Sequence, residues 1–247
     1  MAKTALVTGG SRGIGAEIVR RLRAQEMRVY ALARQSDALD ALCAETGAIA
    51  LPVDLGETAR LETALSGLAP DILINNAGII TGTGPLHTLD ALAIDRMVAI
   101  NVTAVLQTLR IVLPGMIERG HGDVVLIGSI AGRYPLPGMS VYGTTKAAIR
   151  ALANSLRLDL HGSGIRVTEV APGRVETDIT LDLMGGDREA MREALFARYQ
   201  ASQPGDIADA VMAALAMPQR SNIAFVEVVP TRQTVGGALF AEGYDEE

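Results

Sequence analysis

Thr8-Gly9-Gly10-Ser11-Arg12-Gly13-Ile14-Gly15 joins a short apolar run at residues 3–8 to a helical pattern at residues 14–26. Backbone N–H groups at the start of a helix attract a phosphate, and glycine lets the chain turn tightly while a ligand approaches. The spacing G-x-x-x-G-x-G is a moderate signal alone, but the order of strand, turn and helix around it strengthens it. The segment therefore predicts a pyrophosphate-binding turn, with an ordinary glycine turn as the alternative.

Strand and helix patterns alternate along the rest of the chain. Short apolar runs predict strands at 3–8, 29–32, 48–53, 72–74, 124–127, 165–170 and 223–229. Helical patterns lie at 14–26, 36–46, 57–68, 88–119, 140–161 and 205–217. Pro114 is expected to kink or break the longest helix. Continuous apolar strands separated by helices favour an α/β, doubly wound, seven-stranded parallel sheet covered on both faces, in a single domain of residues 1–247.

Residues 174–204 interrupt this alternation. They follow the sixth strand, contain Met184-Gly185-Gly186, and return to a helical pattern at 187–199. In a doubly wound sheet, ligands bind past the carboxyl ends of the strands, which is where this segment begins. We therefore expect 174–204 to be a small helical lid over a substrate.

Composition and charge exclude several classes of protein. The 247 residues carry a formal net charge of −6 without a basic stripe, so neither nucleic acid nor an anionic membrane is an expected partner. Cys43 is the single cysteine and the three histidines lack metal-ligand spacing, so no metal site is expected. No signal peptide is expected at the start of the sequence, and no apolar run reaches the roughly 18 residues of a membrane span. A cytoplasmic location is the expectation.

Tyr142 and Lys146 carry the strongest chemical signal. They stand four residues apart in a predicted helix and therefore share one face. An ammonium about 4 Å from a phenol, at an effective dielectric near 20, favours the phenolate by roughly 4 kcal/mol. We expect this to lower the Tyr142 pKa from about 10 toward the range of a working acid or base. The alternative is an exposed pair on a helix surface; the glycine-rich turn at the start of the chain and Ser129, thirteen residues before the tyrosine, favour the catalytic interpretation.

The end of the second predicted strand bears on the choice of dinucleotide. An NAD-binding chain places a carboxylate about twenty positions after the glycines, to bind the ribose 2′-hydroxyl. This chain has Ala33-Arg34 there, and Ser11 and Arg12 lie in the glycine-rich turn. Two guanidinium groups and a hydroxyl suit a 2′-phosphate. The sequence therefore predicts NADP(H), with two solvated surface arginines as the alternative.

Taken together, these residues resemble the short-chain dehydrogenase/reductase family, and the resemblance covers nearly the whole chain. It implies a Rossmann fold and catalytic roles for Asn101, Ser129, Tyr142 and Lys146, with Tyr142 exchanging a proton with a carbonyl or alcohol substrate. It implies that Asp54 contacts adenine, that Asn75-Asn76-Ala77-Gly78 closes the fourth strand, and that Pro172-Gly173 and Thr177 lie near the nicotinamide. The expected cofactor contacts are Gly9, Ser11, Arg12, Gly13, Ile14, Gly15, Arg34, Asp54, Leu55, Asn75, Ala77, Gly78, Tyr142, Lys146, Pro172, Gly173, Val175 and Thr177.

Within the family, three segments look most like NADP-dependent 3-hydroxy acid (serine) dehydrogenases. They are residues 112–119, 158–162 and 229–233. Reduction of ketones, diketones or 3-oxoacyl groups is the alternative, and a non-catalytic dinucleotide sensor is an alternative of another class.

The substrate side and the assembly are less strongly marked. Arg174 and Arg133 could hold a substrate carboxylate, although a surface charge is the simpler interpretation of each. Apolar candidates for the pocket are Leu136, Met139, Leu181, Leu183 and Met184. Small residues at Gly143, Ala147, Ala148 and Ala151, together with the long helix at 88–119, suggest the homodimer or homotetramer that is usual in the resembled family.

Overall fold

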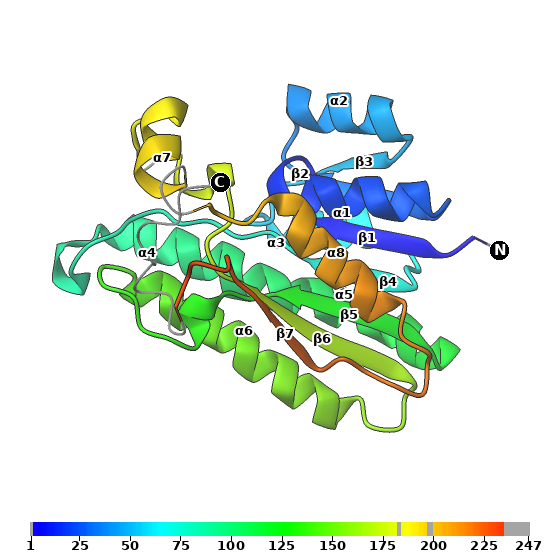
Figure 1. Ribbon diagram of the computed structural model, residues 1–247. Coiled ribbons are helices and arrows are strands. Elements are labelled where there is room, and N and C mark those ends of the chain that lie inside the picture. The colour runs from blue at the N-terminus through cyan, green and yellow to red at the C-terminus, as the bar shows by residue number, and fades with distance from the viewer. Residues whose placement is uncertain (1, 182–183, 197–199, 235–247) are drawn as a thin grey trace.

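The computed structural model describes residues 2–181, 184–196 and 200–234 (Figure 1). Its sheet has seven parallel strands in the order β3-β2-β1-β4-β5-β6-β7. The strands are β1 (Thr4–Thr8), β2 (Arg28–Ala33), β3 (Ile49–Pro52), β4 (Ile72–Asn75), β5 (Gly122–Ile127), β6 (Ile165–Pro172) and β7 (Phe225–Val228). The predicted doubly wound, seven-stranded parallel sheet is therefore confirmed.

Helices cover both faces of this sheet. The described α-helices are α1 (Gly13–Ala24), α2 (Asp37–Thr46), α3 (Thr58–Leu65), α4 (Ala91–Val98), α5 (Ala104–Arg119), α6 (Ser140–Asp159), α7 (Arg188–Leu195) and α8 (Pro204–Leu215). One core cluster joins the sheet to α1, α2 and α8, and a second joins it to α3, α5 and α6. Alternate strand side chains enter alternate clusters, as a sheet buried on both faces requires.

The long predicted helix differs from the expectation. Pro114 lies inside α5 without ending it. The irregularity falls instead at a π-helical turn, Ala99–Thr103, which links α4 to α5 and contains the buried Asn101. Such turns are rare and often occur at functional sites.

The same helical stretch, Ala91–Arg119, is long and apolar enough to cross a membrane by length and composition. The sequence contains no uninterrupted apolar run of that length. Such a signal is weak, because a core helix of a soluble protein passes the same test. Here Val105, Leu109, Val112 and Met116 pack into the second core cluster against the sheet.

The segment 174–204 lies beyond the carboxyl ends of the strands, where Figure 1 shows α7. It contains a 3-10 turn, Asp178–Thr180, followed by α7. Residues 182–183 and 197–199 lie outside the described part of the chain. The pocket candidate Leu183 and the last residues of the predicted helix 187–199 fall within these two gaps. A parallel bridge between Val175 and Ser202 closes the base of the segment.

The sheet order reverses between β1 and β4. The connections run outward from β1 through β2 to β3 on one side, and from β4 through β5 and β6 to β7 on the other. In doubly wound folds, the loops at such a reversal diverge and leave a crevice that binds ligands. The glycine-rich turn after β1 and residues Asn76 to Gly78 after β4 both lie at this point.

Candidate active site

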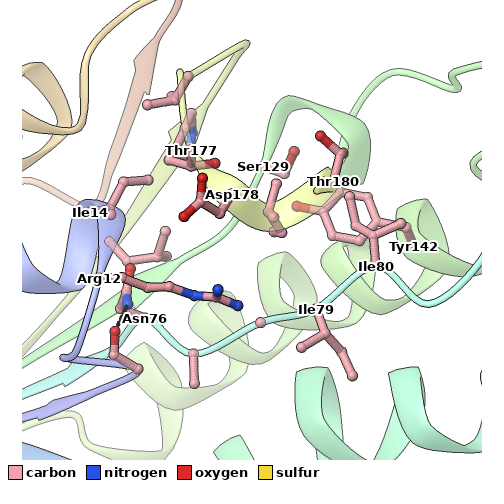
Figure 2. Close-up of a pocket in the computed structure, with 18 of the residues that line it drawn as sticks. Arg12, Ile14, Asn76, Ile79, Ile80, Ser129, Tyr142, Thr177, Asp178 and Thr180 are labelled. Carbon is pink, nitrogen blue, oxygen red and sulfur yellow. Dashed lines mark hydrogen bonds between the residues drawn. The ribbon is translucent and has the colours of Figure 1, made fainter. Parts of the chain in front are cut away.

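A cavity of about 930 Å³ occupies this crevice. It is lined by residues from the turns after β1 to β6 and from the segment 174–204 (Figure 2). Among the predicted site residues, the cavity is lined by Gly9, Ser11, Arg12, Gly13, Ile14, Arg34, Asp54, Leu55, Ala77, Gly78, Ser129, Tyr142, Lys146, Pro172, Gly173, Val175 and Thr177. Gly15, Asn75 and Asn101 do not line it, and the structure places these three behind the wall.

The glycine-rich turn has the conformation that its glycines permit. Gly9 and Gly13 have φ values of 64° and 55°, in the left-handed region that side chains disfavour. A Cβ at Gly15 would lie 2.2 Å from the carbonyl oxygen of Gly9. Glycine at position 15 therefore lets α1 pack closely on its own turn, and the contact of Gly15 with a cofactor stays a prediction.

Asn76 fastens this turn to the loop after β4. Its Nδ2 donates to the carbonyl oxygens of Thr8 and Gly9, at 3.1 Å each. The Thr8 hydroxyl accepts from the backbone nitrogens of Asn76 and Ala77. Asn75 itself is buried at the end of β4. Asn76 thus holds the turn after β1 against the loop after β4, while Asn75 lies in the sheet.

Two arginine residues, Arg12 and Arg34, line the cavity. Arg12 extends from the turn into the pocket (Figure 2), and Arg34 lines the pocket just after β2. Gln35 and Ser36 follow Arg34 along the same wall. On the adjacent wall, Asp54 accepts the backbone N–H of Gly56 at 2.9 Å, which fixes the loop after β3. These residues supply charges and hydrogen-bonding groups that suit a phosphate-bearing adenosine.

Ser129, Tyr142 and Lys146 meet at the other end of the cavity. Their side chains are almost fully buried, with residue exposures of 9 %, 9 % and 4 %. The Lys146 Nζ donates to the carbonyl oxygen of Ile127 at 2.9 Å and lies 5.8 Å from the centre of the Tyr142 ring. The Ser129 Oγ accepts the backbone N–H of Ala131 at 3.1 Å. Figure 2 shows Ser129 and Tyr142 across the pocket from Arg12 and Asn76.

The predicted effect of Lys146 on Tyr142 is wrong for this structure. Burial raises the pKa of Tyr142 to about 12, and the hydrogen bond with Ser129 opposes that rise without cancelling it. Burial also lowers the pKa of Lys146 from 10.5 to about 8. The ammonium is directed at the Ile127 carbonyl, and removal from water outweighs the attraction between the two groups.

Asn101 acts on the site from behind the wall. Its Oδ1 accepts the N–H of Ile79 at 2.8 Å, and its Nδ2 donates to the Ile79 carbonyl at 2.9 Å. The same Nδ2 donates to the Thr145 hydroxyl at 3.1 Å. Thr145 in turn donates to the carbonyl oxygen of Tyr142 at 2.8 Å. Asn101 therefore ties the π-helical turn to the loop after β4 and to the helix that carries Tyr142.

The end of β6 forms the third wall. A Cβ at Gly173 would lie 2.3 Å from the Oε1 of Gln233, which accepts the backbone N–H of Arg174 at 3.0 Å. Gly173 thus permits the chain near residue 233 to close over the end of this strand. Thr177 makes no side-chain capping bond at the 3-10 turn, and its methyl group lies close to Gly13.

The pocket wall beside Tyr142 is apolar. Tyr142 packs in a cluster with Ile80, Leu136, Met139 and Ile179, each of which also lines the cavity. Of the predicted apolar candidates, Leu136, Met139 and Met184 line the cavity, and Leu181 does not. Ile80, Ile179 and Gln233 were missed, because no local pattern separates them from ordinary core or loop residues.

The two arginine candidates for a substrate carboxylate separate in the structure. Arg174 lines the cavity and donates through Nη1 to the carbonyl oxygen of Leu195, at the end of α7. Arg133 lies outside the cavity wall, with its guanidinium 3.4 Å from the centre of the Phe225 ring. Among the described residues, no group of three or more His, Cys, Asp and Glu side chains is placed to hold a metal ion.

The fold and the pocket define a class: doubly wound α/β proteins in which a glycine-rich turn, a serine, a tyrosine and a lysine line one cavity. A sequence profile of short chain dehydrogenases matches residues 3–185. The chain therefore belongs to the short-chain dehydrogenase/reductase family.

Its relatives narrow the comparison. An uncharacterised short-chain dehydrogenase/reductase of Sinorhizobium fredii is 40 % identical over 97 % of this chain and 96 % of its own length. The NADP-dependent 3-hydroxy acid dehydrogenase of Escherichia coli K12 is 36 % identical over 94 % of this chain and 96 % of its own. The closed form of a serine dehydrogenase complexed with NADP⁺ superposes with a TM-score of 0.90 at 35 % identity, covering 97 % of this chain and all of that one.

Proposed function

We propose that this protein is an NADP(H)-dependent oxidoreductase that interconverts a secondary alcohol and a ketone. The observation that carries the proposal is the meeting of Ser129, Tyr142 and Lys146 in the same cavity as the glycine-rich turn. Membership of the short-chain dehydrogenase/reductase family and the NADP-dependent relatives support it.

The residues of the cofactor wall fit NADP(H) in charge and shape. Gly9, Gly13 and the amino end of α1 would hold the pyrophosphate. Arg12 and Arg34 would hold the 2′-phosphate, while Asp54 and Leu55 would face adenine. Pro172, Gly173, Val175 and Thr177 would lie along the nicotinamide. Bound NADPH supplies the hydride, and the protein orients it and manages the charge that develops on the substrate.

Tyr142, Ser129 and Lys146 have different roles in the proposed reaction. Tyr142 donates its proton to the carbonyl oxygen during reduction and takes it back during oxidation. Ser129 binds the same oxygen and holds it within reach of the phenol. Lys146 keeps a positive charge beside the phenol and binds the nicotinamide ribose. Asn101 holds the π-helical turn in place, so that a water molecule there can carry the proton from Lys146 toward solvent.

The relatives favour small 3-hydroxy acids as substrates, with ketones, diketones and 3-oxoacyl compounds as the alternative. A screen should measure NADP⁺ reduction with 3-hydroxy acids and NADPH oxidation with ketones, with the Tyr142→Phe variant as the blank. We expect turnover of at least one 3-hydroxy acid. Reduction of simple ketones without oxidation of any 3-hydroxy acid would exclude the hydroxy acid assignment but keep the reaction class.

The shifted pKa of Lys146 predicts how activity depends on pH. Because burial lowers that pKa to about 8, the lysine loses its charge as pH rises through this value. The kcat/KM for NADPH, which reports groups of the free enzyme, should therefore fall as pH rises through about 8. A Lys146→Met variant should show low activity without this fall. A wild-type profile that stays flat up to the ordinary lysine pKa of 10.5 would contradict the assignment.

We further propose a cytoplasmic homodimer or homotetramer that associates through α4, α5 and α6. Large apolar side chains are exposed on all three helices, among them Leu92 at 76 % and Leu158 at 79 %. Ala147 and Ala151 are exposed one turn apart on α6, where small side chains permit close approach of another helix. Gly143 instead packs against the Ala131 carbonyl of its own chain. We also propose that 174–204 acts as the substrate lid of a single domain.

A further inference from the structure

A buried carboxyl group outside the cavity remains without a role in this mechanism. Glu169 of β6 is 3 % exposed and faces the side of the sheet covered by α6. In the register of the sheet it stands between Leu126 and Phe225. Its Oε1 makes no hydrogen bond within the described residues. Burying a carboxyl group without a hydrogen bond to each oxygen costs free energy. Other interactions of Glu169 must therefore offset that cost.

Two contacts link Glu169 to the segment that carries Ser129. A Cβ at Gly128 would lie 2.7 Å from the Glu169 Oε1, so the carboxyl group packs directly on this glycine. The Oε2 lies 3.9 Å from the Nη2 of Arg133, at the other end of the same short turn. Arg133 is itself stacked on the Phe225 ring. The two ends of the segment 128–133 are thus tied to β6 and β7.

Lys146 contacts the same segment from the opposite direction. Its Nζ donates to the Ile127 carbonyl, one residue before Gly128. The backbone of Lys146 packs on Gly132, where a Cβ would lie 2.6 Å from the Lys146 carbonyl oxygen. Any movement of 128–133 would therefore shift Ser129 relative to Tyr142 and Lys146.

We propose that Glu169, paired with Arg133, is a positioning residue that holds the Ser129 turn and the Lys146 ammonium in their working arrangement. The inference rests on the proposed oxidoreductase function. Glu169 touches neither the cavity nor the reacting atoms, so it acts through the residues it holds.

The electrostatics agree with this geometry. Burial raises the pKa of Glu169, and the charges of Arg133, Arg150, Arg157 and Lys146 oppose that rise. In return, the negative charge of Glu169 raises the pKa of Lys146 against the effect of burial. Removing the charge should therefore lower the Lys146 pKa below its value of about 8.

The test is Glu169→Gln, which keeps the shape of the side chain and removes its charge. We expect kcat to fall about 10- to 100-fold, the scale of a small misplacement of catalytic groups. The fall of kcat/KM at alkaline pH should move to lower pH than in the wild type. Glu169→Asp, which keeps the charge, should leave that part of the profile in place.

Glu227→Gln is the matched control, because this glutamate lies on the neighbouring strand β7 and does not line the cavity. It should keep the wild-type kcat and pH profile. An unchanged kcat in Glu169→Gln, or a lower kcat with an unmoved pH profile, would overturn the proposal and indicate a purely structural role. Absence of turnover in the wild type would instead overturn the proposed function, and this inference with it.

Discussion

Replacement of Tyr142 by phenylalanine should reduce kcat by about 10²- to 10⁴-fold, the usual contribution of a positioned acid or base. The change removes one oxygen from a buried ring that keeps its apolar contacts with Ile80 and Met139. NADPH binding should stay nearly normal, because the adenosine end of the cavity is built from other residues. Fluorescence titration with NADPH and steady-state turnover measure the two properties separately.

Tyr134→Phe provides the matched control. Tyr134 follows Ser129 closely in sequence, but it does not line the cavity, so loss of its hydroxyl should leave turnover unchanged. An active Tyr142→Phe variant would contradict the assigned proton transfer. It would also reopen the alternative of a protein that binds a dinucleotide without performing chemistry on it.

Replacement of Arg34 by aspartate should shift the cofactor preference from NADPH toward NADH. A hydrogen bond to a charged group contributes about 1.5–3 kcal/mol, so loss of the guanidinium should weaken NADPH binding roughly 10- to 150-fold. The new carboxylate repels a 2′-phosphate and can accept hydrogen bonds from the two ribose hydroxyls of NADH. The ratio of kcat/KM for NADPH to that for NADH should therefore fall by more than the loss of NADPH binding alone.

Arg28→Ala is the control for this change. Arg28 is the first residue of β2, the strand that Arg34 follows, and it lies at the end of β2 far from the cavity. Its guanidinium lies over the Tyr30 ring. It should keep the wild-type preference, which separates a local phosphate contact from a general change of charge. A wild-type protein that already prefers NADH would contradict the argument from Arg12 and Arg34.

The fold could be predicted because its signals are local. Buried parallel strands appear as continuous apolar runs, and the glycine-rich turn has a spacing that few other structures require. Ser129, Tyr142 and Lys146 could be found in the same way, since two lie one helical turn apart. The boundaries were less exact: the predicted helix 57–68 ends at Leu65 in the structure.

The features that sequence reasoning missed depend on contacts between distant residues. Asn101 bonds Ile79, which lies 22 positions away, so its place behind the pocket wall has no local sign. The pKa of Tyr142 was predicted in the wrong direction because a pattern of residues shows which charge is near but not how much water is lost. The same holds for Glu169, whose cationic neighbours come from several elements.

The π-helical turn at Ala99–Thr103 divides one long helical rod into two halves with different rotational phase. An extra residue in a helix turns everything beyond it by about 100° around the axis. Met97, before the turn, faces the apolar cluster around Tyr142, whereas Val105 and Leu109, after it, face the sheet. The half that shapes the substrate side can therefore diverge in sequence while the other half keeps the scaffold intact, so new specificities need not compromise folding.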